Sequence, residues 1–147
     1  MPYALITGAS KGIGLAIADE LARRKFDVLL VARSEELLQQ ESQRLMAAYG
    51  IRADYLAIDL ARTDSAQQVH DWCVEKGYEV QILVNNAGYG LSGPFESHAL
   101  GQHMDMLSVT TGHWYNYVIC FCPGFGSRQH HTSSTLAVRR LTRPFRG

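Results

Sequence analysis

Thr7-Gly8-Ala9-Ser10-Lys11-Gly12-Ile13-Gly14 follows directly on the apolar run Ala4-Leu5-Ile6 and opens a segment with helical periodicity. Its three glycines therefore lie on a turn between a predicted strand and a predicted helix. Unpaired N–H groups and partial positive charge at a helix N-terminus favour a pyrophosphate, provided that the chain can approach it closely. We assign Gly8 to the tight turn, Gly12 to close approach of phosphates and Gly14 to helix–strand packing. A glycine-rich turn without a ligand is the alternative.

Strands and helices alternate along the first two thirds of the sequence. The run 28–32 is continuously apolar, which is typical of a parallel strand covered on both faces. Ser34 is a predicted N-cap of the next helix, and Gly50 is its predicted end. Right-handed crossovers predict an α/β doubly wound sheet with strand order 3-2-1-4 and a ligand crevice outside strands 1 and 4. The predicted strands are 3–7, 28–32, 53–58 and 80–84, and the helices between them are 13–25, 35–49 and a third that starts at 63 or 64 and ends at 76.

A second motif, Asn85-Asn86-Ala87-Gly88, ends the apolar run Ile82-Leu83-Val84. With both motifs in this order, the chain resembles the short-chain dehydrogenase/reductase family, whose T-G-x-x-x-G-x-G stands at 7–14 and whose N-N-A-G stands at 85–88. The resemblance covers residues 1 to about 105. It implies the N-terminal half of a Rossmann-type NAD(P)-binding domain in residues 1–105, and an NAD(P)(H)-dependent oxidoreductase acting on an alcohol or carbonyl.

The resemblance also implies which residues bind the cofactor. Asp59, with Leu60 beside it, matches the position that bonds the adenine amino group, although a turn aspartate is the alternative. Arg33 stands at the end of the second strand, where an acidic residue would select NAD. With Lys11 nearby, a guanidinium suits a 2′-phosphate, so NADP(H) is the expected cofactor and NAD(H) a possible one; a solvated surface arginine is the alternative. The cofactor-binding set is Gly8, Ser10, Lys11, Gly12, Ile13, Gly14, Arg33, Asp59, Leu60, Asn86, Ala87 and Gly88.

The family's catalytic residues find no match here. Its general acid/base is a tyrosine whose pKa is lowered by a lysine four residues later. No tyrosine of this chain has that lysine, and Tyr115 and Tyr117 are followed by Ile119 and Phe121. The family's helix asparagine is expected near 108–110, where none stands. We therefore assign no catalytic residue, and no metal ligand either, because the histidines lack ligand spacing.

The charge distribution divides the chain near residue 105. Residues 1–105 hold 9 basic and 14 acidic groups, and residues 106–147 hold 5 arginines and no acidic group. We expect 106–147 to be an irregular basic tail outside the fold, as a truncated or frame-shifted gene would give, and a basic arm for phosphates or a membrane surface is the alternative. The missing later strands would leave strand 4 as an open edge through which the chain could self-associate.

Composition limits the remaining alternatives. Zero net charge argues against a nucleic-acid partner. The absence of a long apolar stretch or a secretory signal predicts a cytoplasmic protein without a membrane partner. Three functions stay open: an NADP(H)-dependent oxidoreductase by descent, a non-catalytic nucleotide-binding module, and an inactive truncated product.

Overall fold

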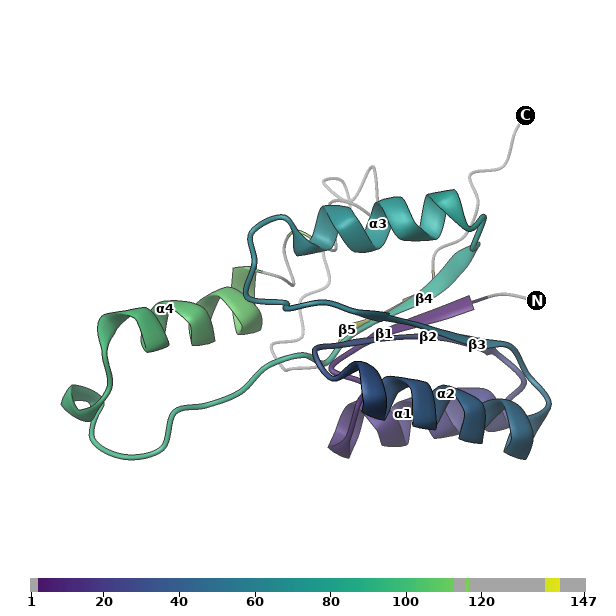
Figure 1. Ribbon diagram of the computed structural model, residues 1–147, viewed down its shortest axis with the longest axis horizontal. Helices are drawn as coiled ribbons and strands as arrows, with labels where there is room; N and C mark the ends of the chain where they lie inside the picture. Colours follow the sequence, from purple (N-terminus) through teal and green to yellow (C-terminus); the bar gives the residue numbers. More distant parts are fainter. Residues whose placement is uncertain (1–2, 113–115, 117–136, 141–147) are drawn as a thin grey trace.

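The computed structural model describes residues 3–112, 116 and 137–140, and its elements follow the predicted alternation closely (Figure 1). No helix in this described part is long and apolar enough to cross a membrane. The elements are β1 (Tyr3–Thr7), α1 (Gly12–Arg23), β2 (Asp27–Ala32), α2 (Glu35–Tyr49), β3 (Ala53–Ala57), α3 (Ser65–Glu75), β4 (Val80–Asn85), the 3₁₀ turn η1 (Phe95–Ser97), α4 (Leu100–Leu107), the π-helical turn η2 (Ser108–Gly112) and β5 (Ala137–Arg140).

The sheet has the order β3-β2-β1-β4-β5, and its first four strands run parallel. The predicted order 3-2-1-4 is thereby confirmed. Helices α1 and α2 cover one face and α3 covers the other (Figure 1), so every residue of β1 and β2 is buried. Alternate side chains of these two strands enter separate apolar clusters, one under α1 and α2 and one under α3. Because these four strands are parallel, every turn from a strand to the following helix lies at the same edge of the sheet, the edge formed by the carboxyl ends of the strands.

Strand β5 corrects the expectation of an open edge at strand 4. The sequence assigned no strand to residues 106–147, yet 137–140 pairs antiparallel with β4 from Ile82 to Asn85. The physical reason is that an edge strand presents unpaired N–H and C=O groups, which any extended segment of sufficient reach can satisfy. The other predicted tail features, Tyr115, Tyr117 and the histidines at 113, 130 and 131, lie outside the described residues.

Three helix ends show how local sequence sets the turns. Gly50 ends α2 with φ +63°, the left-handed conformation that glycine adopts without strain. Ser34 holds the N-cap position of α2, but its hydroxyl makes no capping bond, which corrects the predicted role of its side chain. After α1, Lys25 takes the same left-handed conformation at φ +66°, and its Nζ donates to the Tyr49 carbonyl at 2.6 Å.

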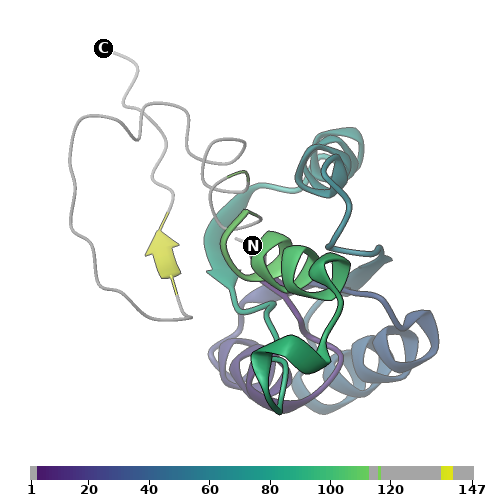
Figure 2. The same cartoon turned by 90° about the vertical axis from the view of Figure 1, so that its left-hand side faces the viewer.

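Residues 89–107 form an arm that extends from the carboxyl edge of the sheet (Figures 1 and 2). Helix α4 buries none of its residues, and the arm is folded mainly on itself. The ring of His103 stacks on Phe95 with centroids 4.1 Å apart, and its Nε2 lies 3.0 Å from the Phe95 carbonyl oxygen. The predicted domain boundary near residue 105 falls inside α4, and η2 continues this helix to residue 112. The boundary therefore stays a prediction.

Candidate functional site

The hydroxyl of Thr7 ties the two sequence motifs together at the carboxyl ends of β1 and β4. Its Oγ1 accepts the backbone N–H groups of Asn86 and Ala87, each at 3.1 Å, and donates to the Val84 carbonyl at 3.4 Å. The side chain is buried, and the three bonds span sequence separations of 77 to 80 residues. Water cannot easily replace bonds in such a site, so the two loops are held as one unit.

The Asn86 amide continues this connection into the glycine turn. Its Nδ2 lies 3.3 Å from the carbonyl oxygens of both Thr7 and Gly8. A Cβ on Gly14 would lie 2.3 Å from the Gly8 oxygen and 2.5 Å from that Nδ2. The predicted packing role of Gly14 therefore has a definite geometric basis. The helix that starts here approaches the turn more closely than any side chain would permit.

Gly8 and Gly12 adopt left-handed conformations for different reasons. Gly8, at φ +67°, turns beneath the second loop, where a Cβ would meet the Ala87 Cα at 3.0 Å. Gly12, at φ +62°, has nothing within 4 Å of such a Cβ, so its backbone faces open space at the start of α1. Lys11 and Ile13 on either side of it are exposed, and Ser10 is half-buried. This open backbone is the geometry that close approach of a phosphate requires.

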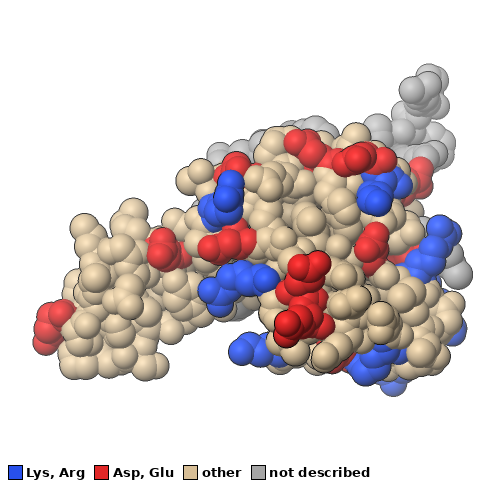
Figure 3. All heavy atoms as spheres, viewed as in Figure 1, with Lys and Arg blue, Asp and Glu red and all other residues tan. Residues whose placement is uncertain are grey.

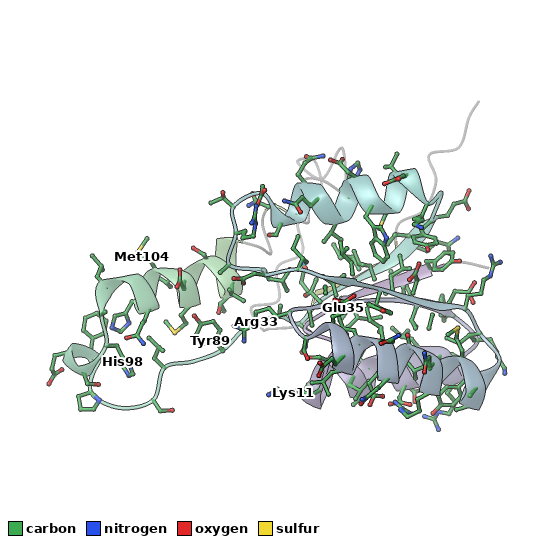
Figure 4. All side chains as sticks on the ribbon, in the orientation of Figure 1. Lys11, Arg33, Glu35, Tyr89, His98 and Met104 are labelled. Carbon is green, nitrogen blue, oxygen red and sulfur yellow. The ribbon has the colours of Figure 1, made fainter. Side chains whose placement is uncertain are left out.

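Basic groups lie next to this turn. Figure 4 shows Lys11 and Arg33 extending past the strand ends toward the space below the arm. Both side chains are exposed, and no ion pair involves either of them within residues 3–112, 116 and 137–140. The arm itself contributes only acidic charges to the face drawn in Figure 3, because residues 88–112 include no lysine or arginine. An anion entering here would therefore meet its positive charges at the turn and at the end of β2.

Asp59 follows β3 at the same edge, and its Oδ1 accepts the Ala61 N–H at 3.0 Å. The turn role that sequence left as an alternative is thus present in the structure. The carboxylate is nevertheless exposed, so one oxygen bonded to its own turn does not exclude a second bond to a ligand. Leu60 is buried in the cluster under α3 and contributes packing at this position.

Gly88 connects the second motif to the end of the arm. A Cβ on Gly88 would meet the Thr110 Oγ1 at 3.5 Å, and Val109, next to Thr110 in η2, is buried. The η2 turn at the end of the arm therefore lies next to the second motif. No group of three or more His, Cys, Asp or Glu side chains that could hold a metal occurs among the described residues.

The structure brings the predicted residues of both motifs together at one edge, with Arg33 and Asp59 on the neighbouring strands. Sequence reasoning omitted Thr7 from the site. Its signal was present, because a threonine stands at the end of an otherwise wholly apolar buried strand. A buried hydroxyl at that point must find hydrogen-bond partners, and the nearest available ones belong to the adjacent strand's loop.

Comparison with known proteins identifies relatives over most of the chain. A profile of the short chain dehydrogenase family matches residues 2–129, further along the chain than the two motifs predict. The chain is 37% identical over 92 residues to very-long-chain 3-oxoacyl-CoA reductase-A of Danio rerio, covering 63% of this chain and 28% of that protein. It is 36% identical over 107 residues to 17-beta-hydroxysteroid dehydrogenase type 3 of Rattus norvegicus, covering 73% and 34%.

Solved structures give the same picture. A short-chain dehydrogenase from Sphingobium yanoikuyae in complex with NADPH superposes with a TM-score of 0.78 at 33% identity, covering 85% of this chain and 48% of that one. L-sorbose reductase from Gluconobacter frateurii, complexed with NADPH and L-sorbose, gives a TM-score of 0.78 at 29% identity, covering 84% and 47%. The chain thus spans about half the length of these solved proteins and about a third of the curated relatives.

Proposed function

Because the chain belongs to the short-chain dehydrogenase family, we propose that its first 105 residues bind NADP(H), and NAD(H) more weakly. The observation that carries this proposal is the connection between Thr7, Asn86 and Gly8, with Gly14 packed against it. It fixes an open glycine turn at a helix N-terminus, and this open turn is the shape that a pyrophosphate fits. The residues present therefore suit the cofactor of the family.

Each part of the site has a distinct proposed role. The backbone at Ser10, Gly12 and Ile13 faces the phosphates. Ala87 and Gly88 lie along the adenosine half of the dinucleotide, and the Asp59 carboxylate accepts a hydrogen bond from the adenine amino group. When bound, the nicotinamide supplies or accepts the hydride, and the protein's part is to bind and orient it.

Arg33 and Lys11 are the proposed basis of the preference for NADP(H). A guanidinium can bond a 2′-phosphate through two charge-assisted hydrogen bonds, which are worth about 1.5–3 kcal/mol, or about tenfold to 150-fold in affinity. Neither group has to give up an ion pair with another described residue to do so. The phosphate would therefore meet exposed cations that form no ion pair within the described part of the chain.

The reaction of the family is oxidoreduction, and an alcohol or carbonyl is the proposed substrate class. The 147 residues contain no tyrosine with a lysine four positions later. A phenol with a pKa near 10 is a poor base at pH 7 without such a cation. We therefore propose that this chain binds the dinucleotide without efficient hydride transfer. That property favours a nucleotide-binding module as the second candidate function.

Thermal unfolding with each dinucleotide tests the proposal. At equal concentration NADPH should raise Tm more than NADH, because ligand that binds only the folded state stabilises it by mass action. Arg33→Asp should reverse the order. Lys76→Asp makes the same charge change just past α3, at the opposite end of the sheet, and should leave the order unchanged. Equal shifts would refute the selectivity, and no shift with either dinucleotide would refute binding.

A further inference from the structure

The start of α2 places negative charge beside the cations proposed to hold the 2′-phosphate. Glu35 and Glu36 form the acidic first turn of this helix, and Arg33 immediately precedes the N-cap residue Ser34. Consecutive Cα atoms are about 3.8 Å apart, so the Cα of Glu35 lies within about 7.6 Å of that of Arg33. Figure 4 shows Glu35 at the same edge of the sheet as Arg33 and Lys11.

In the absence of a ligand, the carboxylates of Glu35 and Glu36 stabilise the N-terminus of α2. Because the Ser34 hydroxyl makes no capping bond, the serine side chain does not satisfy the N–H groups of the first turn. Acidic residues in that turn offset the helix dipole and stabilise the helix. A 2′-phosphate beside Arg33 would draw on the same positive potential and would be repelled by the same carboxylates.

From this competition we infer that Glu35 is a specificity-determining residue that limits the preference for NADP(H), an inference that rests on the function proposed above. Glu35 is exposed, and no ion pair with Arg33 or Lys11 neutralises it in the described part of the chain. Its full charge therefore opposes a phosphate. NADH carries no charge at the 2′ position, so its affinity depends little on Glu35.

The expected size follows from Coulomb's law in a solvated site. For a phosphate carrying between one and two negative charges, a carboxylate about 10 Å away weakens binding by about twofold to fivefold at 50 mM salt, if the effective dielectric constant is about 40, between those of a protein surface and of bulk water. The effect should shrink to less than about 1.5-fold at 0.5 M NaCl, because the Debye length falls to about a third of its value at 50 mM.

Glu35→Gln tests the inference, since it removes the charge and keeps a residue of similar helix propensity. Calorimetric titration with NADPH and NADH, at 50 mM and 500 mM NaCl, should show NADPH binding about twofold to fivefold tighter at low salt only. NADH binding should change by less than about 1.5-fold, because it has no 2′-phosphate. Glu75→Gln is the matched control, with the same charge change at the far end of α3, and should leave both affinities unaltered.

The outcomes separate the inference from the function on which it rests. If the wild-type chain binds neither dinucleotide, the proposed function fails and the inference fails with it. If the wild type binds and Glu35→Gln leaves NADPH affinity unchanged, only the role of Glu35 is refuted. An equal gain for NADPH and NADH also refutes it, because NADH has no 2′-phosphate to be repelled. A gain that persists at 500 mM NaCl refutes it as well, because salt at that concentration screens the repulsion.

Discussion

Replacing Gly14 by alanine should test the close approach of α1 to the glycine turn. The added Cβ would stand 2.3 Å from the Gly8 carbonyl oxygen, 2.9 Å from its carbon and 2.5 Å from the Asn86 Nδ2. The first of these contacts is about 1 Å shorter than an ordinary non-bonded contact. Since the obstructing atoms belong mainly to backbone, α1 must move rather than a flexible side chain.

The cost can be estimated from overpacked sites in other proteins. Forcing an extra carbon into a close-packed position costs about 1–3 kcal/mol. For a chain of this size that corresponds to a fall in Tm of about 3–10 °C. A shift of α1 also separates the Asn86 amide from the Gly8 oxygen, so NADPH affinity should fall at least about tenfold, which corresponds to the loss of one or two such bonds.

Two alanine substitutions at other glycines serve as controls. Gly101→Ala lies in α4 with nothing within 4 Å of the new Cβ, so Tm should stay constant or rise slightly. Gly12→Ala also has open space, and its cost of about 1–2 kcal/mol comes from the left-handed backbone alone. Thermal unfolding followed by circular dichroism measures all three. Wild-type stability in Gly14→Ala, or an equal loss in Gly101→Ala, would refute the reasoning.

Four further outcomes follow from the structure. Thr7→Val leaves two half-buried loop amides without their acceptor, so we expect a loss of about 1–3 kcal/mol in urea unfolding, and a loss below about 0.5 kcal/mol would contradict the role of the hydroxyl. Burial raises the pKa of the Cys73 thiol to about 12, whereas the thiol of the unfolded chain ionises near pH 8.5. The free energy of unfolding should therefore be unaffected by this thiol below about pH 8.5 and should fall as the pH rises toward 12. Cys73→Ala should reduce this alkaline loss of stability, measured by unfolding at several pH values, and an unchanged alkaline loss would contradict it. Lys25→Gly relieves the strain of a left-handed backbone at Lys25 but also removes the exposed hydrogen bond from Lys25 Nζ to the Tyr49 carbonyl. The free energy of unfolding should rise by about 0.5 kcal/mol, and a fall would show that the hydrogen bond contributes more than the strain costs. NADPH oxidation with a panel of ketones and aldehydes, followed through the cofactor's absorbance, should stay well below about 1 s⁻¹, and turnover at or above that rate would mean that another group has replaced the tyrosine.

Sequence alone predicts the sheet well because its strands are read from local patterns. Continuous apolar runs mark β1 and β2, which are covered on both faces, and handed crossovers then determine that β4 lies beside β1. The two motifs reach the same edge of the sheet as a direct result. The positions of Gly8, Gly12 and Gly14 follow from these local rules.

The remaining features depend on partners that are distant in sequence. The pairing of β5 depends on an edge left by the rest of the sheet, and the short segment 137–140 has no periodicity of its own to predict it. The bonds of Thr7 require the register between β1 and β4. Whether the Ser34 hydroxyl caps α2 depends on a side-chain geometry that the residue type permits but does not impose.

The Thr7 hydroxyl also has a consequence for the order of folding. Its partners lie 77 to 80 residues further along the chain, so both motifs can meet only after a long loop has closed and β1 has paired with β4. Helix α1 and its glycine turn can form from local contacts long before that event, because helices form much faster than parallel strand pairs. During synthesis, a nascent chain that has not yet emerged beyond Ala87 has the turn without the hydrogen bonds that hold it. Substitutions at Thr7 should accordingly act on a late step of folding and leave early helix formation unchanged.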